Sequence, residues 1–170
     1  SAIFMTTYIN AIDPLAKVYD GYFVHSRFGG APGVDAARTP GPPQNQPGVR
    51  FRPDLRAPVM TLLAETDVAS PGGWWTAAQD DDAKLRVWQI PGAAHADIYM
   101  FQVSANDSGL TPIEKLAPLW KPTNVTIVGA MAKPINAAPQ HHYVAQAALA
   151  ALDRWVRTGK APPNAPRLEL

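Results

Sequence analysis

Hydrophobic positions recur along the chain at two different spacings, which separate predicted helices from predicted strands. In residues 140–158 the apolar side chains return every three or four positions, which is typical of an amphipathic helix. Gly159 and then Pro162-Pro163 are expected to end it. Residues 2–12 show a similar mixture of spacings, and Asp13-Pro14 follows as a stop signal. We therefore expect a helix close to each end of the chain.

Shorter segments with a different pattern are predicted to be strands. Residues 56–63 form a nearly continuous apolar run, which suits a strand that is covered on both faces. Residues 85–90 alternate apolar and polar side chains, and residues 19–25 are rich in β-forming types. Because helical or irregular segments separate these strands, we expect an α/β fold of about three parallel strands with flanking helices.

The connections between these elements are long and rich in proline. Residues 29–57 hold many Pro and Gly residues and little periodicity, so we expect a surface loop or part of a cap. Ser70 followed by Pro71 favours a helix start, and Thr111 with Glu114 matches a capping box. Residues 125–128 form a possible short strand. We find no internal repeat.

Composition and charge remove several functional classes. The chain has 170 residues with 46% hydrophobic and 17% charged, which indicates a globular chain large enough for one core. A net charge of +1 leaves no basic face for nucleic acid, and no apolar run is long enough for a membrane span. With no cysteine there is no disulfide, thiolate catalysis or Cys-based zinc site. None of this fixes the compartment, so localisation stays open.

Asp67 and His95 are the polar residues that carry the predicted chemistry. Each comes just after a predicted strand, where open α/β sheets place their functional groups. A right-handed crossover returns parallel strands to one edge, so the two side chains are expected to lie together. A carboxylate that orients a histidine makes it a proton relay near neutral pH. The order acid then histidine matches the second and third members of a Ser-Asp-His triad.

Both residues also have structural interpretations. Asp67 could be a turn or N-cap aspartate, and His95 a loop or capping histidine. Glu65 is a rival acid, because at a strand end it points to the same side as Asp67.

The other candidate residues are expected to be structural. His141-His142 opens the last helix and points to two faces, so the pair is expected to be solvated rather than to bind one metal. His25 is expected to be structural or to line a pocket, and Trp74-Trp75 to lie in the core. The acidic run 80–82 lacks the spacing of a calcium loop. We expect no metal and no cofactor.

These stretches resemble the C-terminal half of an α/β-hydrolase, and more narrowly the bacterial "alpha/beta hydrolase domain" family of esterase-like proteins. The most specific match is Glu65-Thr-Asp-Val68 followed by Gly92-Ala-Ala-His-Ala-Asp97. Further matching stretches span nearly the whole chain: 1–2, 8–10, 19–27, 52–59, and parts of 136–157. The resemblance implies that Asp67, rather than Glu65, is the acid and that His95 is the general base.

The resemblance also implies a nucleophilic serine in an elbow of the type Gly-x-Ser-x-Ser/Gly, just before a helix that residues 2–12 match. Positions two before and two after that serine must be small. If Ser1 were the nucleophile, the branched Ile3 would occupy a small position and clash. We therefore expect Ser1 to hold the small position and the nucleophile to lie two residues upstream. Ser1 acting with a free amino terminus is the alternative.

The sequence thus predicts a single partial α/β-hydrolase domain over residues 1–170, whether a fragment, a processed product or a trimmed chain. It would supply the acid and base of a carboxylic-ester hydrolase for a small-molecule ester, without the nucleophile and oxyanion hole. Its expected partner is the missing N-terminal half, which would cover the free edge of the strand near Tyr22. Alone, the chain is expected to be inactive. A non-catalytic hydrolase-like module that binds a partner or ligand is the alternative.

Overall fold

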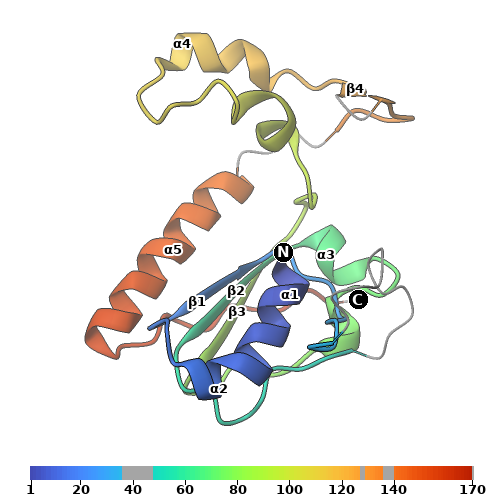
Figure 1. Ribbon diagram of the computed structural model, residues 1–170. Helices are drawn as coiled ribbons and strands as arrows, with labels where there is room; N and C mark the ends of the chain where they lie inside the picture. Colours follow the sequence, from blue (N-terminus) through green and yellow to red (C-terminus); the bar gives the residue numbers. More distant parts are fainter. Residues whose placement is uncertain (36–47, 127–128, 136–139, 170) are drawn as a thin grey trace.

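A three-stranded parallel sheet forms the centre of the protein. The computed structural model describes residues 1–35, 48–126, 129–135 and 140–169. Strands β1 (Tyr22–His25), β2 (Val59–Ala64) and β3 (Leu85–Ile90) lie in the order β1-β2-β3, and both pairs are parallel (Figure 1). Every residue of β2 is buried, which confirms the prediction of a central strand covered on both faces. The α/β fold predicted from the sequence is therefore confirmed.

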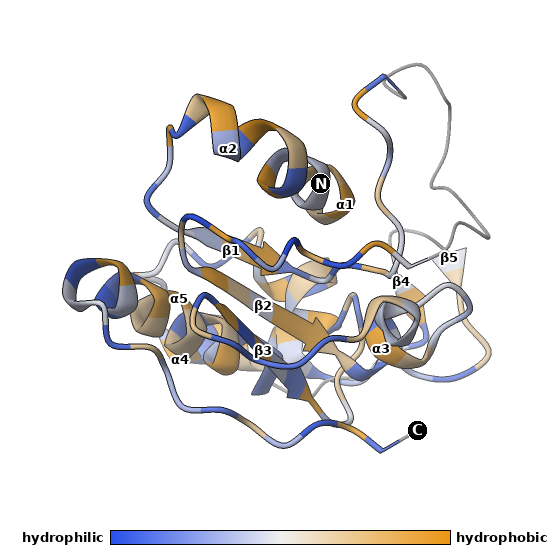
Figure 2. Ribbon diagram, turned by 90° about the horizontal axis from the view of Figure 1, so that it is seen from below, coloured by the Kyte–Doolittle hydropathy of each residue, from blue (hydrophilic) through white to orange (hydrophobic). Residues whose placement is uncertain are grey.

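Helices cover the two faces of this sheet. On one face, Ile9 of the first helical segment packs with inward residues of the strands and with Trp74. On the other face, α5 (Gln140–Thr158) packs against alternate residues of β2 (Figure 1). Figure 2 shows that β2 is mostly hydrophobic along its length, as a strand between two cores requires. The sheet thus lies between two hydrophobic cores, one on each face.

Helix α5 has the bounds that its periodicity predicts. Ala148, Leu152 and Trp155 lie on its buried stripe. Its end is a left-handed turn at Gly159, where φ is +73° and the backbone N–H donates to the Trp155 carbonyl at 2.8 Å. A side chain there would strain the backbone, which explains the glycine.

The first helical segment is longer than predicted. It comprises α1 (Ala2–Thr7), η1 (Tyr8–Ile12) with a wider π-type turn, and α2 (Asp13–Ala16). The prediction that Asp13-Pro14 ends the helix was wrong, because Pro14 lies in the first turn of α2, where a proline needs no N–H partner. The segment ends at Lys17, whose φ of 51° is left-handed.

A short helix that the sequence did not predict follows β2 directly. This helix is α3 (Glu65–Ala69), and it carries Asp67. The helix predicted after Ser70-Pro71 is only one turn of 3₁₀ helix, η2 (Trp74–Ala77). Ser70 does not begin that helix because both its backbone N–H and its hydroxyl donate to the Thr66 carbonyl, which ends α3 instead.

Residues 98–126 and 129–135 form an outer lobe beyond the carboxyl edge of the sheet (Figure 1). It contains η3 (Tyr99–Val103), α4 (Ile113–Leu116), η4 (Ala117–Trp120) and a hairpin of β4 (Val125–Thr126) with β5 (Gly129–Ala130). The capping box predicted at Thr111 was wrong, since its hydroxyl donates to the Asn106 carbonyl and Pro112 precedes α4. The short strand predicted at 125–128 is present at 125–126, and 127–128 lie outside the described residues.

The predicted loop 29–57 contains neither helix nor strand in its described parts, 29–35 and 48–57. Residues 36–47 lie outside the described residues. β1 is an edge strand in the sheet order, as predicted. No helix in the described part of the chain is long and apolar enough to cross a membrane.

Candidate functional site

The ends of β2 and β3 bring Asp67 and His95 together. The two strands pair in register up to Ala64 and Ile90, so they end at the same level. Asp67 lies in the first turn of α3, and His95 lies in the loop of residues 91–97 that follows β3. His95 Nδ1 is 2.5 Å from Asp67 Oδ1. The structure therefore joins the two residues that the sequence predicted to meet.

Asp67 is fully buried and both its oxygens have partners. Oδ1 accepts from His95, while Oδ2 accepts from the backbone N–H of Ala64 at 2.8 Å. The second bond reaches back to the residue before α3 and stabilises the start of this helix. The helix-start and acid–histidine interpretations of Asp67 therefore both describe real contacts. A buried carboxylate with two partners has a well-determined orientation.

The neighbours of Asp67 hold the loop that carries His95. Glu65 Oε2 accepts from the Gly92 N–H at 2.8 Å, and Thr66 Oγ1 accepts from the His95 N–H at 2.6 Å. Gly92 has a φ of +70°, a conformation that glycine adopts without strain. Glu65, the rival acid, thus binds backbone rather than the imidazole of His95. Three successive residues of α3 therefore bond to the loop of residues 91–97: Glu65 and Thr66 to its backbone, and Asp67 to the His95 ring.

The imidazole of His95 is half-exposed and electrostatically coupled to Asp67. Its side chain is 46% exposed, and its ring centroid lies 5.4 Å from that of Phe28. The hydrogen bond with Asp67 raises the pKa of His95 above its ordinary 6.5, while partial burial opposes that shift. When Nδ1 donates to the carboxylate, the neutral ring presents the Nε2 lone pair. This is the tautomer that a general base requires.

The chain's first residue lies at the same edge of the sheet. Figure 1 shows the amino terminus at the level of the carboxyl ends of the strands. The Ser1 carbonyl accepts from the Met5 N–H at 3.0 Å, so Ser1 is continuous with the first turn of α1.

Sequence reasoning missed His141. It was predicted to be solvated, but it is only 6% exposed and lies against the loop of residues 91–97. Its Nδ1 is 3.1 Å from the Ala94 carbonyl, and its Nε2 is 2.7 Å from His25 Nε2. The prediction was wrong because His141 lies on the buried face of α5, together with Ala148, Leu152 and Trp155. Residues spaced by three, four or seven positions share one face of a helix. This spacing was a usable signal.

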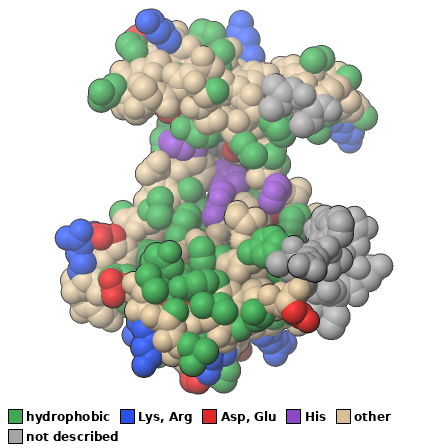
Figure 3. Space-filling view, in the orientation of Figure 1, with side chains coloured by type: hydrophobic (Ala, Val, Ile, Leu, Met, Phe, Trp, Pro, Cys, Tyr) green, Lys and Arg blue, Asp and Glu red, His purple; other side chains and the backbone are tan. Residues whose placement is uncertain are grey.

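Histidine side chains gather in the hollow between the outer lobe and the sheet (Figure 3). His142 contacts the outer lobe through Tyr99, with ring centroids 4.1 Å apart, and Tyr99 in turn lies 5.6 Å from the ring of Trp120. Within the described ranges, no group of three or more His, Cys, Asp or Glu side chains could hold a metal ion.

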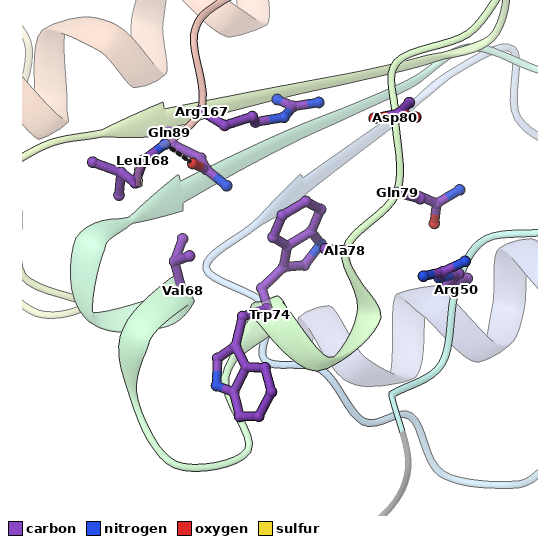
Figure 4. A pocket seen from close by; sticks show the side chains of 10 residues that line it. Arg50, Val68, Trp74, Ala78, Gln79, Asp80, Gln89, Arg167 and Leu168 are labelled. Atoms are coloured by element: carbon purple, nitrogen blue, oxygen red, sulfur yellow. Dashed lines mark hydrogen bonds between the residues drawn. The ribbon is translucent and has the colours of Figure 1, made fainter. Parts of the chain in front are cut away.

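A cavity of about 450 Å³ lies between η2, β3 and the C-terminal segment, and Val68 of α3 is among its lining residues (Figure 4). Neither Asp67 nor His95 lines it. Trp74 is buried as predicted, whereas Trp75, expected in the core, is 53% exposed and lines the cavity. Arg50 and Arg167 also line it, although Arg167 pairs with Asp81 at 2.5 Å.

The parallel sheet, with an acid and a histidine joined past its carboxyl edge, has the arrangement of an α/β-hydrolase fold. The profile of the family described as "Alpha/beta hydrolase domain" matches residues 1–170, and the chain belongs to this family. The family resemblance predicted from the sequence is confirmed. Comparison with curated proteins and with solved structures found no match.

Proposed function

We propose that this chain supplies the acid and base of a Ser-Asp-His triad in a hydrolase of carboxylic esters. The observation that carries the proposal is the hydrogen bond between a fully buried Asp67 and a half-exposed His95. Burial fixes the carboxylate, and exposure leaves the second imidazole nitrogen accessible to a substrate. Family membership supports the reaction class, hydrolysis.

In this mechanism His95 moves the proton in both halves of the reaction. A serine hydroxyl attacks the acyl carbon of the ester while Nε2 of His95 takes its proton. Asp67 holds the ring and stabilises the imidazolium that forms. The imidazolium then protonates the departing alkoxide, which leaves as the alcohol. In the second half His95 takes a proton from water as that water attacks the acyl-enzyme, and it returns the proton to the serine oxygen when the acid leaves.

The proposed nucleophile is a serine two residues upstream of Ser1, in an N-terminal half that completes the sheet beside β1. Two observations support this arrangement: the amino terminus lies at the functional edge, and β1 is an edge strand (Figure 1). The elbow needs a small residue two positions after the nucleophile. A nucleophile two residues upstream places Ser1 there, whereas Ser1 as the nucleophile would place the branched Ile3 there. A small-molecule ester is the proposed substrate.

The test uses p-nitrophenyl esters with the 170-residue chain, alone and combined with the N-terminal half. We expect no hydrolysis by the chain alone and hydrolysis by the combination. Asp67→Ala should lower kcat by about 10⁴-fold and His95→Ala by about 10⁶-fold. The control is Asp153→Ala, which removes an exposed acid paired with Arg157 at 2.8 Å on α5. Full activity of the His95→Ala combination would refute the assignment.

A fluorophosphonate probe identifies the nucleophile. We expect labelling of the serine upstream of Ser1, and labelling of Ser1 itself would support the free-amino-terminus alternative. The binding-module alternative gains its support from the cavity beside Trp75, which is separate from Asp67 and His95. A degenerate elbow upstream, together with no labelling and no hydrolysis, would favour that module.

A further inference from the structure

We propose that His141 is a positioning residue for His95, and that His25 sets the tautomer in which His141 does this. The proposal rests on the proposed function, in which His95 is the general base. The contacts that carry it are made by His25 and His141, which lie outside the triad. His25 comes from the end of β1 and His141 from the first turn of α5, so two elements far apart in the sequence meet at the loop of residues 91–97.

The peptide unit between Ala94 and His95 is held on both sides. Its N–H, from His95, donates to Thr66 Oγ1 at 2.6 Å. Its carbonyl, from Ala94, lies 3.1 Å from Nδ1 of His141. Both polar groups of one peptide plane are therefore held, one from α3 and the other from α5. The plane from which the His95 side chain departs has a determined orientation, which the bond to Asp67 then completes.

The contact with the Ala94 carbonyl determines which nitrogen of His141 carries the proton. A carbonyl oxygen can only accept, so Nδ1 of His141 must carry hydrogen. The neutral ring then has its lone pair on Nε2, which lies 2.7 Å from Nε2 of His25. With His141 neutral, His25 donates, as the Nε2–H tautomer. The chain of donors runs from His25 to His141 to the backbone that carries His95.

Charged groups also face the pair of His25 and His141. Asp97 is 3.8 Å from His141 Nδ1, and its own carboxylate accepts from the Met100 N–H at 3.0 Å. Partial burial, and then His141, lower the pKa of His25 below 6.5, whereas Asp67 and Asp97 oppose the shift and His95 adds to it. His25 is therefore neutral at pH 7, as the donor chain requires. Two cations 2.7 Å apart would repel strongly, so the pair cannot hold two extra protons.

The alternative is that His141 only fills space at the start of α5. Its burial at 6% exposure would serve either role. The two interpretations differ in what a loss of the Nδ1–H group does to His95. A space-filling residue affects stability alone, whereas a positioning residue also affects the protonation of His95.

The first experiment is ¹⁵N NMR of the histidine side chains in the 170-residue chain at pH 7.5, assigned with single His→Gln variants. We expect His141 in the Nδ1–H tautomer and His25 in the Nε2–H tautomer. A His141 found in the Nε2–H tautomer would overturn the proposal. This measurement needs no enzymatic activity, so it stands whether or not the chain belongs to an esterase.

The second experiment compares His141→Leu with His141→Asn, whose side-chain amide can replace the Nδ1–H donor. We expect the pKa of His95 to fall toward 6.5 in His141→Leu, and to stay near the parent value in His141→Asn. In the intact enzyme kcat should fall about 10- to 100-fold in His141→Leu with little change in KM. An unchanged His95 pKa in His141→Leu would overturn the proposal. If His141→Leu does not fold, His141→Asn provides the test, and a His95 pKa shifted from the parent value in His141→Asn would overturn the proposal.

These outcomes separate the two proposals. Full hydrolysis by His95→Ala would refute the triad and leave the tautomers of His25 and His141 as measured. Correct triad behaviour with an unchanged His95 pKa in His141→Leu would refute the positioning role alone.

Discussion

Asp67 Oδ1 and His95 Nδ1 lie 2.5 Å apart although 28 residues separate them in the sequence. The carboxylate is fully buried, and its other oxygen holds the start of α3 through the Ala64 N–H. A buried carboxylate without partners would be costly. Asp67 therefore both stabilises the start of α3 and orients His95 for the proposed chemistry.

Asp67→Asn keeps the shape of the side chain but removes its charge. We expect the pKa of His95 to fall toward 6.5, because the hydrogen bond with the carboxylate is the main cause of its increase. In the intact enzyme kcat should fall about 10⁴-fold. The pKa is measured by NMR titration of the His95 ring. The matched control is Glu65→Gln, which retains an acceptor for the Gly92 N–H and should leave the His95 pKa unchanged.

The raised pKa of His95 predicts the pH dependence of both activity and stability. A general base must be neutral, so kcat/KM should rise with pH through a midpoint above 6.5 and move to lower pH in Asp67→Asn. The sign for stability is opposite. The charged histidine paired with Asp67 contributes fully below pH 6.5, and this contribution is lost as the pH rises through the folded-state pKa. A pH–rate profile with its midpoint below 6.5 would contradict the coupling.

A buried acid at the opposite end of the sheet is expected to set the response to low pH. Asp13 accepts from the Tyr22 hydroxyl at 2.5 Å and from Arg56 at 2.6 Å. Burial alone would raise the pKa of Asp13, but hydrogen bonds from Arg56 and Tyr22 outweigh it and hold the pKa below 3.8. The resulting stability is fully present above pH 3.8 and is lost as the pH falls through the folded-state pKa.

Asp13→Ala should therefore lower the free energy of unfolding by about 2 kcal/mol at pH 7, and by less near pH 3. Urea unfolding followed by circular dichroism measures both values. Asp54→Ala is the control, because Asp54 is 67% exposed in its pair with Arg52 and should have no measurable effect. An equal loss in the two variants would count against the buried cluster.

The packing of α5 on the sheet predicts a contrast between two leucines of one helix. Leu152 is 8% exposed and packs with Met60 and Leu62 of β2 in one core cluster. Leu152→Ala should lower the free energy of unfolding by about 3 kcal/mol, because it leaves a cavity beneath the sheet. Leu149 is 46% exposed and serves as the matched control. Leu149→Ala should change the free energy of unfolding by less than about 0.5 kcal/mol. Similar losses would mean that α5 does not pack as described.

The elements that local patterns predicted best are those whose burial is uniform along one face. Leu85–Ile90 and Gln140–Thr158 have the predicted bounds, because alternation and helical periodicity directly record which side chains meet the core. Helix α3 was missed because five residues directly after a strand are too few for a periodic pattern. The predicted start at Ser70 failed for a related reason: its hydroxyl was already bonded within α3.

For the candidate site, local patterns were enough to predict that an acid and a histidine follow neighbouring parallel strands, and a right-handed crossover brings the ends of these strands to one edge. The folded structure shows which acid is bonded to His95: Glu65 and Asp67 follow the same strand and share the first turn of α3, but only Asp67 contacts the imidazole, whereas Glu65 accepts from the Gly92 N–H. Only the tertiary structure placed His25 and His141 in contact across 116 residues. Spacing along the chain records which face of an element is buried, whereas partners across that face depend on how distant elements pack.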